Sequence, residues 1–275
     1  MALLLLTAVV HEAAAQHCAI VPKNANLGDT LRITCTGEVS SAKWNDRTIH
    51  LFSQPDGKRL GLMPVSVKDP PGPASIEILS KDGKTVGKEM FLVRATRFPS
   101  ENVRLSADIE ALRSTPEEIK LLTEFRNGVS EERYWQDPLA PPVEGCVTSP
   151  FGVKRLHNGK PTGEFHGGVD QRTPAGEPIR AIADGKIVYA QKFNVLGNAV
   201  GIDHGQGLGS MFLHMSKLEV APGALVKRGD VLGYAGSTGR STGPHLHWVV
   251  YANGVNVNPA QWVKFTACPR PSKKK

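Results

Sequence analysis

Apolar and polar side chains alternate over much of the first hundred residues, as they do in strands with one buried face. Residues 30–36 alternate strictly and predict one such strand. Two further strand-like runs, 75–79 and 89–94, flank Asp82-Gly83, which is a hairpin signal. We therefore expect a small antiparallel β-sandwich of immunoglobulin-like type over residues 17–98.

The apolar spacing becomes helical between residues 106 and 135. Thr115 fits an N-cap, Pro116 the first helical position and Glu118 the third, and together they predict a capped helix start. The apolar stripe that follows consists of Ile119, Leu121, Leu122 and Phe125. We expect a helical connector over residues 99–137 that packs on a neighbouring domain.

The rest of the chain is again rich in strand-like runs, which many glycines separate. Three prolines between residues 138 and 142 mark its boundary. The strand-like runs are 185–190, 199–203, 210–215 and 245–251. Because no long helical stripe occurs here, we expect an all-β domain over residues 138–268, followed by a basic tail at 269–275.

Composition and charge narrow the class of protein. The chain has 275 residues, 40% hydrophobic and 21% charged, which excludes a disordered or collagen-like chain. Its longest apolar run, Ala2 to Val10, is too short to span a bilayer, so we expect no membrane span. The formal net charge is +7, but four of the positive charges lie in the last six residues. No nucleic-acid partner is therefore expected.

The N-terminus predicts export. The apolar run is followed by Ala13-Ala14-Ala15, a small-residue cleavage pattern, so residues 1–15 are interpreted as a secretory signal. We expect a location in the periplasm or elsewhere in the cell envelope, or secretion from the cell.

Four cysteines in an exported chain favour two disulfides, and four cysteines allow three connectivities. We expect the pairs Cys18–Cys35 and Cys146–Cys268, the second of which would hold together the two ends of one domain. A four-cysteine zinc site is the alternative, but no CxxC spacing supports it.

Six of the nine histidines lie in the last domain, which makes metal binding a hypothesis to test. His166 and Asp170 are ligand types that zinc accepts, but a straight strand would separate them by roughly 13 Å. Gly167-Gly168 permits a bend between them. His245 and His247 are two residues apart, so on a strand they face the same side, roughly 6.6 Å apart. One of them can bind a metal while the other stands beside its open position.

Three motifs occur in order along the last domain: His166-Gly-Gly-Val-Asp170, Phe212-Leu-His-Met-Ser216 and the run from Gly236 to His247. They resemble those of the lysostaphin/LytM-type zinc endopeptidases, a family that hydrolyses peptidoglycan. The resemblance covers about residues 145–262. It implies a lysostaphin-like antiparallel β domain of the duplicated hybrid motif type.

The resemblance also implies the roles of five side chains. By position, His166, Asp170 and His247 are similar to the family's zinc ligands, with one zinc ion (Zn2+) per chain. His214 and His245 match the two histidines that flank the water nucleophile without binding the metal. One imidazole is expected to accept a proton from water, and the other to stabilise the oxyanion or protonate the leaving amine. Which histidine has which role stays open. No HExxH motif supplies a glutamate base.

Four other polar residues of the last domain have predicted places outside this set of five. We expect His204 to have a structural role in or near a turn and His157 to be a solvated loop residue. Arg155 and Asn158 fit a loop near the cleft in related sequences.

The sequence thus predicts an exported, monomeric zinc endopeptidase that cuts peptide crosslinks or stem peptides of bacterial peptidoglycan. Two alternatives stay open: a catalytically inactive member that binds the wall or activates an amidase, and a zinc carboxypeptidase. We expect the N-terminal sandwich to position the enzyme, to bind a regulatory partner or to cover the cleft as a lid.

Overall fold

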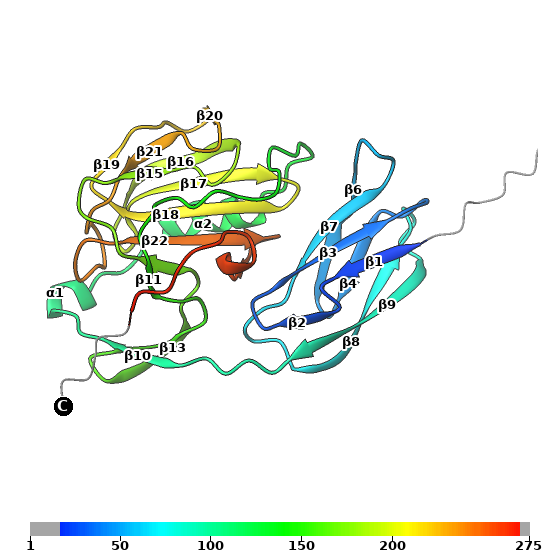
Figure 1. Cartoon of the computed structure of the whole chain (residues 1–275), viewed down its shortest axis with the longest axis horizontal. Coiled ribbons are helices and arrows are strands. Elements are labelled where there is room, and N and C mark those ends of the chain that lie inside the picture. The colour runs from blue at the N-terminus through cyan, green and yellow to red at the C-terminus, as the bar shows by residue number, and fades with distance from the viewer. Residues whose placement is uncertain (1–16, 270–275) are drawn as a thin grey trace, which may run out of the picture.

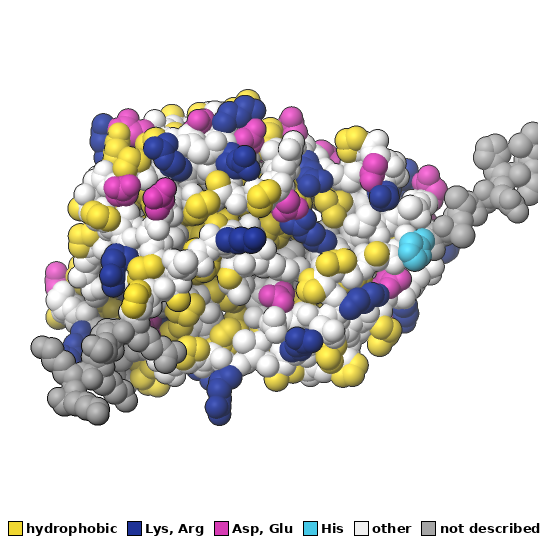
Figure 2. Space-filling view, viewed as in Figure 1, with side chains coloured by type: hydrophobic (Ala, Val, Ile, Leu, Met, Phe, Trp, Pro, Cys, Tyr) yellow, Lys and Arg dark blue, Asp and Glu magenta, His cyan; other side chains and the backbone are white. Residues whose placement is uncertain are grey.

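The structure, a computed structural model, describes residues 17–269 and arranges them in two β-rich parts (Figure 1). The predicted secretory signal, and the predicted basic tail beyond its first residue, lie outside the described residues. Within residues 17–269, no helix is both long and apolar enough to cross a membrane. Basic, acidic and hydrophobic side chains are interspersed on the face shown in Figure 2.

Nine strands form the N-terminal part. They are β1 (Cys18–Val21), β2 (Asn24–Asn26), β3 (Thr30–Cys35), β4 (Ser41–Trp44), β5 (Arg47–His50), β6 (Phe52–Ser53), β7 (Arg59–Pro64), β8 (Gly72–Leu79) and β9 (Thr85–Arg94). They build two sheets with the orders β1-β3-β7-β6 and β2-β9-β8-β4-β5. One apolar core holds side chains of both sheets, among them Ile33 and Phe91. The immunoglobulin-like type of this sandwich stays a prediction.

Local predictions for this part hold. In β3, Leu31, Ile33 and Cys35 are buried, so the strand presents the expected face to the core. Strands β8 and β9 pair antiparallel as the expected hairpin, and Gly83 in its turn has a φ of 79°. A positive φ of this kind strains residues that carry a side chain, which explains the glycine.

The C-terminal part contains most of the remaining strands. They are β11 (Val147–Ser149), β12 (Lys154–His157), β13 (Lys160–Phe165), β14 (Val169–Gln171), β15 (Pro178–Arg180), β16 (Gly185–Phe193), β17 (Gly197–Gly205), β18 (Leu208–Met215), β19 (Lys217–Leu218), β20 (Leu225–Val226), β21 (Val231–Tyr234), β22 (Leu246–Ala252) and β23 (Val255–Val257). A 3-10 helix, η1 (Pro259–Gln261), follows β23. The predicted predominantly β fold class is confirmed.

An eight-stranded sheet forms the centre of this part. Its order is β11-β14-β22-β18-β17-β16-β20, and β23 pairs with β22. A second sheet, β15-β21-β19, lies beside it, and the apolar core joins Trp248 and Phe212 of the large sheet to Ile179 and Leu232 of the small one. Strands β16, β17, β18 and β22 run side by side in Figure 1.

Both expected disulfides are formed. Cys18 and Cys35 are register partners on β1 and β3, so their bond links neighbouring strands of one sheet. The Cys146–Cys268 bond joins residues 122 positions apart and closes the C-terminal part at its two ends.

The connector differs from its prediction at its start, since it opens with a strand. Strand β10 (Ser100–Val103) pairs parallel with β12, and the short helix α1 (Ala107–Glu110) and the helix α2 (Pro116–Asn127) follow. The predicted helical connector therefore begins with a strand, and its first helix starts only at Ala107. Residues 100–103 carry no helical stripe, and their backbone groups are satisfied by the edge of β12.

Helix α2 begins as predicted. The Thr115 hydroxyl accepts from the Glu118 amide at 3.2 Å, and the Glu118 carboxylate accepts from the Thr115 amide at 3.0 Å. Leu122 and Phe125 are buried, and Phe125 packs edge-on against Tyr189 with 5.2 Å between the ring centroids. Ile119 is 56% exposed, so its place in the predicted apolar stripe is wrong. The helix covers the face of the large sheet opposite the second sheet.

Arginine and tryptophan side chains dock the sandwich onto the C-terminal part. The Arg32 guanidinium carbon lies 5.3 Å from the ring centroid of Trp135 and 4.9 Å from that of Trp262, and the same group pairs with Asp137. The Gln261 side chain accepts from the Thr30 amide at 2.6 Å and donates to the Thr30 carbonyl at 2.9 Å. The two parts therefore share a specific interface of cation–π and hydrogen-bond contacts.

Replacing Glu118 by alanine is expected to lower the free energy of unfolding by about 2 kcal/mol. The change removes the capping box and the carboxylate that accepts from the Asn194 amide at 2.6 Å. Chemical denaturation measures the effect. Glu117→Ala is the control, because Glu117 is exposed in the same turn, and we expect little change. Equal losses in the two variants would contradict this account.

Candidate metal centre and groove

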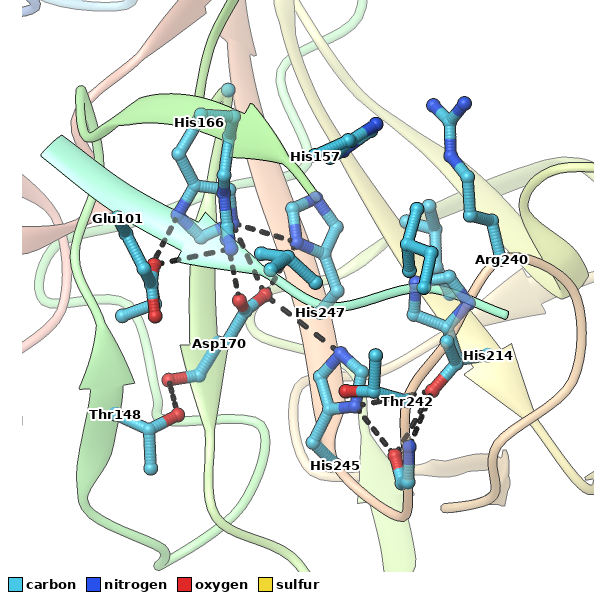
Figure 3. Close-up of a pocket in the computed structure, with 18 of the residues that line it drawn as sticks. Glu101, Thr148, His157, His166, Asp170, His214, Arg240, Thr242, His245 and His247 are labelled. Carbon is cyan, nitrogen blue, oxygen red and sulfur yellow. Dashed lines mark hydrogen bonds and ion pairs between the residues drawn. The ribbon is translucent and has the colours of Figure 1, made fainter. Parts of the chain in front are cut away.

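The pairing of β14 with β22 brings together residues far apart in the sequence. Asp170 on β14 is the direct register partner of His247 on β22. His166 precedes β14, and its Nε2 lies 3.1 Å from Asp170 Oδ1 and 2.9 Å from His247 Nδ1. The third separation, from His247 Nδ1 to Asp170 Oδ1, is 2.7 Å. These three predicted ligands therefore converge on one point, as Figure 3 shows.

The two glycines between His166 and Asp170 allow their backbone to pack closely against residues of β22 and β23. A Cβ on Gly168 would lie 2.1 Å from the Trp248 carbonyl oxygen, and one on Gly167 would lie 2.4 Å from Asn256 Nδ2. Neither glycine has a positive φ. Larger residues here would push β14 away from β22 and separate His166 and Asp170 from His247.

Backbone carbonyls fix the tautomers of three imidazoles. The Nδ1 atoms of His166, His245 and His214 lie 2.9, 2.8 and 2.8 Å from the carbonyl oxygens of Pro150, Gly243 and Thr238, respectively. A carbonyl only accepts, so each Nδ1 carries the proton and donates it. In the neutral ring, each Nε2 therefore has a free lone pair.

His214 and His245 stand beside the three converging residues. Their ring centroids are 5.1 Å apart, and the ring centroid of His214 lies 6.1 Å from that of His247. His245 Nε2 is 3.9 Å from Asp170 Oδ1. His214 has a φ of 59°, in the left-handed region that strains a residue with a side chain. Its backbone amide donates to Leu196 at 3.0 Å, which helps to hold this conformation.

Burial lowers the pKa of two of the site histidines, His214 and His247. Desolvation, with smaller contributions from His247 and His245, lowers the pKa of His214 to about 3. Desolvation also lowers the pKa of His247, against the opposing effect of Asp170. Burial alone would raise the pKa of Asp170, but the hydrogen bonds with His166 and His247 hold that pKa well below its usual range. The cluster thus places the ionised Asp170 carboxylate close to imidazole nitrogens that carry lone pairs.

Arg155 forms an ion pair with the Asp170 carboxylate through the oxygen that does not face the histidines. Its guanidinium donates to Asp170 Oδ2 at 2.7 Å and lies 3.1 Å from Glu101 Oε2. Glu101 belongs to β10 of the connector, and its carboxylate also accepts from the Ser149 hydroxyl at 2.6 Å. Arg155 lies on β12, so the structure places it in a strand and not in the predicted loop.

A groove of about 810 Å³ runs over the cluster. Its lining residues include the four predicted site histidines and Asp170, together with residues 101–105 of the connector and residues 240–245. None of residues 17–98 lines it, so within the described chain the sandwich does not cover the groove as a lid. The connector's contribution was missed by sequence reasoning, because residues 101–105 carry neither a motif nor an apolar period.

Two further histidines take different places. His157 ends β12 as a half-buried residue that lines the groove, so its prediction as a solvated loop residue is wrong. Desolvation, and next the charge of Arg240, lower the pKa of His157. His204 is fully buried outside the groove, with Nδ1 2.8 Å from the Asp184 carbonyl and Nε2 2.8 Å from the Ser210 hydroxyl. These contacts agree with its expected structural role.

Comparison with known proteins gives the family. The sequence profile of peptidase family M23 matches residues 164–259, which contain all five site residues. A crystal structure from Pseudomonas aeruginosa that was assigned to peptidase M23 is 30% identical, has a TM-score of 0.65 and covers 89% of this chain and 92% of its own. The chain belongs to peptidase family M23. The resemblance found in the sequence is thereby confirmed.

Curated relatives match the C-terminal part of this M23 chain. The DD-carboxypeptidase/endopeptidase Mpg of Neisseria meningitidis is 44% identical over 121 residues, which are 44% of this chain and 28% of the relative. The peptidoglycan DD-endopeptidase ShyB of Vibrio cholerae is 42% identical over 106 residues, or 38% of this chain and 24% of the relative. The chain thus spans about a quarter of the length of these relatives.

The burial of His204 predicts a loss of stability in acid. Desolvation lowers the pKa of His204 to about 4, whereas an unfolded histidine titrates near its ordinary 6.5. As the pH falls from about 6.5 to 4, the unfolded chain takes up a proton that the folded chain does not. We expect this group to cost about 3 kcal/mol of stability over that range.

Denaturation curves of His204→Gln and wild type between pH 7 and 4 measure this cost. The variant should lose that much less stability on acidification, while His17→Gln, at an exposed position, should follow the wild type. Parallel pH profiles for His204→Gln and wild type would contradict the prediction.

Proposed function

We propose that this M23 chain is a zinc-dependent endopeptidase that hydrolyses peptide crosslinks or stem peptides of bacterial peptidoglycan. The observation that carries the proposal is the convergence of His166, Asp170 and His247, whose ligand atoms all lie within 4.8 Å of one another. The names of the curated relatives support the substrate class. The two disulfides support export, because such bonds persist in oxidising compartments.

The donor set fits a catalytic zinc ion. Two imidazole nitrogens, His166 Nε2 and His247 Nδ1, and one carboxylate oxygen, Asp170 Oδ1, are ligands that zinc prefers. Three protein ligands leave one coordination position open, as in catalytic sites. The bond from His166 Nδ1 to Pro150 and that from Arg155 to Asp170 Oδ2 are the outer contacts that orient such ligands. When bound, zinc would polarise the scissile carbonyl and lower the pKa of a bound water.

We assign the proton transfer to His245. Its Nε2 has a free lone pair and lies 3.9 Å from Asp170 Oδ1, one of the proposed ligand atoms. His245 then donates the same proton to the leaving amine. His214 is more deeply buried and stays neutral, so its Nε2 accepts a hydrogen bond and orients the reacting groups. This assignment proposes one division of the two roles that the sequence left open.

Two rival functions share this site. An inactive wall-binding or amidase-activating member would have no use for the complete set of ligands and flanking imidazoles found here. A carboxypeptidase activity is favoured by one observation, the name of the Neisseria relative, which includes both activities. Internal fragments released from sacculi support the endopeptidase, and release of single terminal residues alone supports the carboxypeptidase.

Substitution of the flanking histidines tests the proposal. His245→Ala should lower the rate of crosslink cleavage in purified sacculi by about 10²-fold or more, because the proton acceptor is lost. Mass analysis of the released fragments measures the rate, and the zinc content of the variant should stay at the wild-type level. His17→Ala is the control and should retain full activity, since His17 is exposed and lies outside the groove. A wild-type protein that holds zinc but releases no fragments would favour the wall-binding function.

A further inference from the structure

The two arginines of the groove differ in how their charges are balanced. Arg155 pairs with Asp170 and Glu101. Arg240 also lines the groove and is half-buried, yet among residues 17–269 no carboxylate lies within 4.0 Å of its guanidinium. A partly desolvated cation without a counter-charge loses hydration and gains no ion pair. Such a group in a binding groove is suited to an anion that the ligand brings.

The loop that carries Arg240 is held firmly against the reactive side chains. The Arg240 amide donates to the Val195 carbonyl at 2.8 Å. A Cβ on Gly239 would lie 2.3 Å from the Gly197 nitrogen, so the loop packs directly on the start of β17. Thr238, two residues earlier, accepts the Nδ1 proton of His214. The position of Arg240 is therefore tied to the position of a proposed reactive imidazole.

The surroundings of Arg240 form a positive region of the groove. Figure 3 shows Arg240 and His157 on the side of the cluster away from Glu101 and Thr148. The charge of Arg240 reaches His157, as the effect on that ring's pKa indicates. Arg104, which is exposed, lines the groove as well and adds positive charge. The opposite wall holds the Glu101 carboxylate.

We propose that Arg240, with His157 beside it, is the subsite for a free carboxylate of the peptide substrate. It selects peptides in which the residue next to the scissile amide carries that carboxylate. A guanidinium binds a carboxylate through two parallel hydrogen bonds, which fixes both position and orientation. The inference rests on the proposed function and adds to it a class of substrate: crosslinks through an amino acid with a free carboxylate, in preference to neutral bridges.

Binding of two matched probes tests this subsite directly. The probes are synthetic branched peptides that differ only in carrying a carboxylate or a carboxamide next to the crosslink amide. Calorimetry on the full chain, in the His245→Ala background to prevent turnover, measures both affinities at low and high salt. We expect the carboxylate probe to bind about tenfold more tightly than the carboxamide probe, with a preference that weakens as salt rises.

Arg240→Gln should abolish this preference by weakening the carboxylate probe about tenfold and leaving the carboxamide probe unchanged. Arg240→Lys should keep part of the preference, because the charge stays while the paired geometry is lost. Arg94→Gln is the control, since it removes the same charge from an exposed position of the sandwich outside the groove. It should bind both probes as the unaltered background does.

Three outcomes would overturn the inference: equal binding of the two probes, a preference that survives in Arg240→Gln, or no binding of the carboxylate probe up to millimolar concentration. Cleavage is scored separately on sacculi. Cleavage without a carboxylate preference removes the subsite and leaves the proposed function. A carboxylate preference without any cleavage by the zinc-loaded protein supports the subsite and removes the function.

Discussion

The register between β14 and β22 is the constraint on which the site depends. It places Asp170 opposite His247, and a slip by one residue would turn His247 to the other face of the sheet. The register is held by burial, because Leu246 and Trp248 are both fully enclosed in the core. It is also held by the Trp248 indole, which donates to the Gln171 side chain at 2.7 Å. The core of this M23 domain thus determines which polar groups meet in the groove.

The connector contributes to the groove of the C-terminal domain. Its strand β10 lies on the edge of β12 and brings Glu101 to Arg155, so a segment outside the family match contributes to the groove. Its helix α2 packs on the far face of the large sheet, and Glu118 holds the Asn194 amide at the start of the 194–196 loop. That loop accepts from the backbones of His214 and Arg240. Helix, loop and reactive side chains are therefore coupled by a short chain of hydrogen bonds.

The sequence predicted those parts of the fold and site that depend on local pattern. The strand at 30–35, the hairpin around Gly83 and the capped start of α2 each follow from a few neighbouring residues. The five site residues were implied by the resemblance of three motifs to those of a known family, and the structure brings them together. Ile119, His157 and residues 100–103 were misread, because their surroundings are set by strands and loops distant in the sequence. The bracing of Asp170 by Arg155 and the absence of a carboxylate beside Arg240 within the described residues were likewise visible only in three dimensions.

The most direct test of the central claim is the location of the metal. A crystal of the purified protein, measured on both sides of the zinc absorption edge, reports where zinc lies. The account predicts one anomalous peak per chain, within bonding distance of His166 Nε2, Asp170 Oδ1 and His247 Nδ1, with zinc–nitrogen and zinc–oxygen separations of about 2.0–2.2 Å. A zinc-supplied crystal with no peak between these three side chains, or with its peak on other residues, would contradict it.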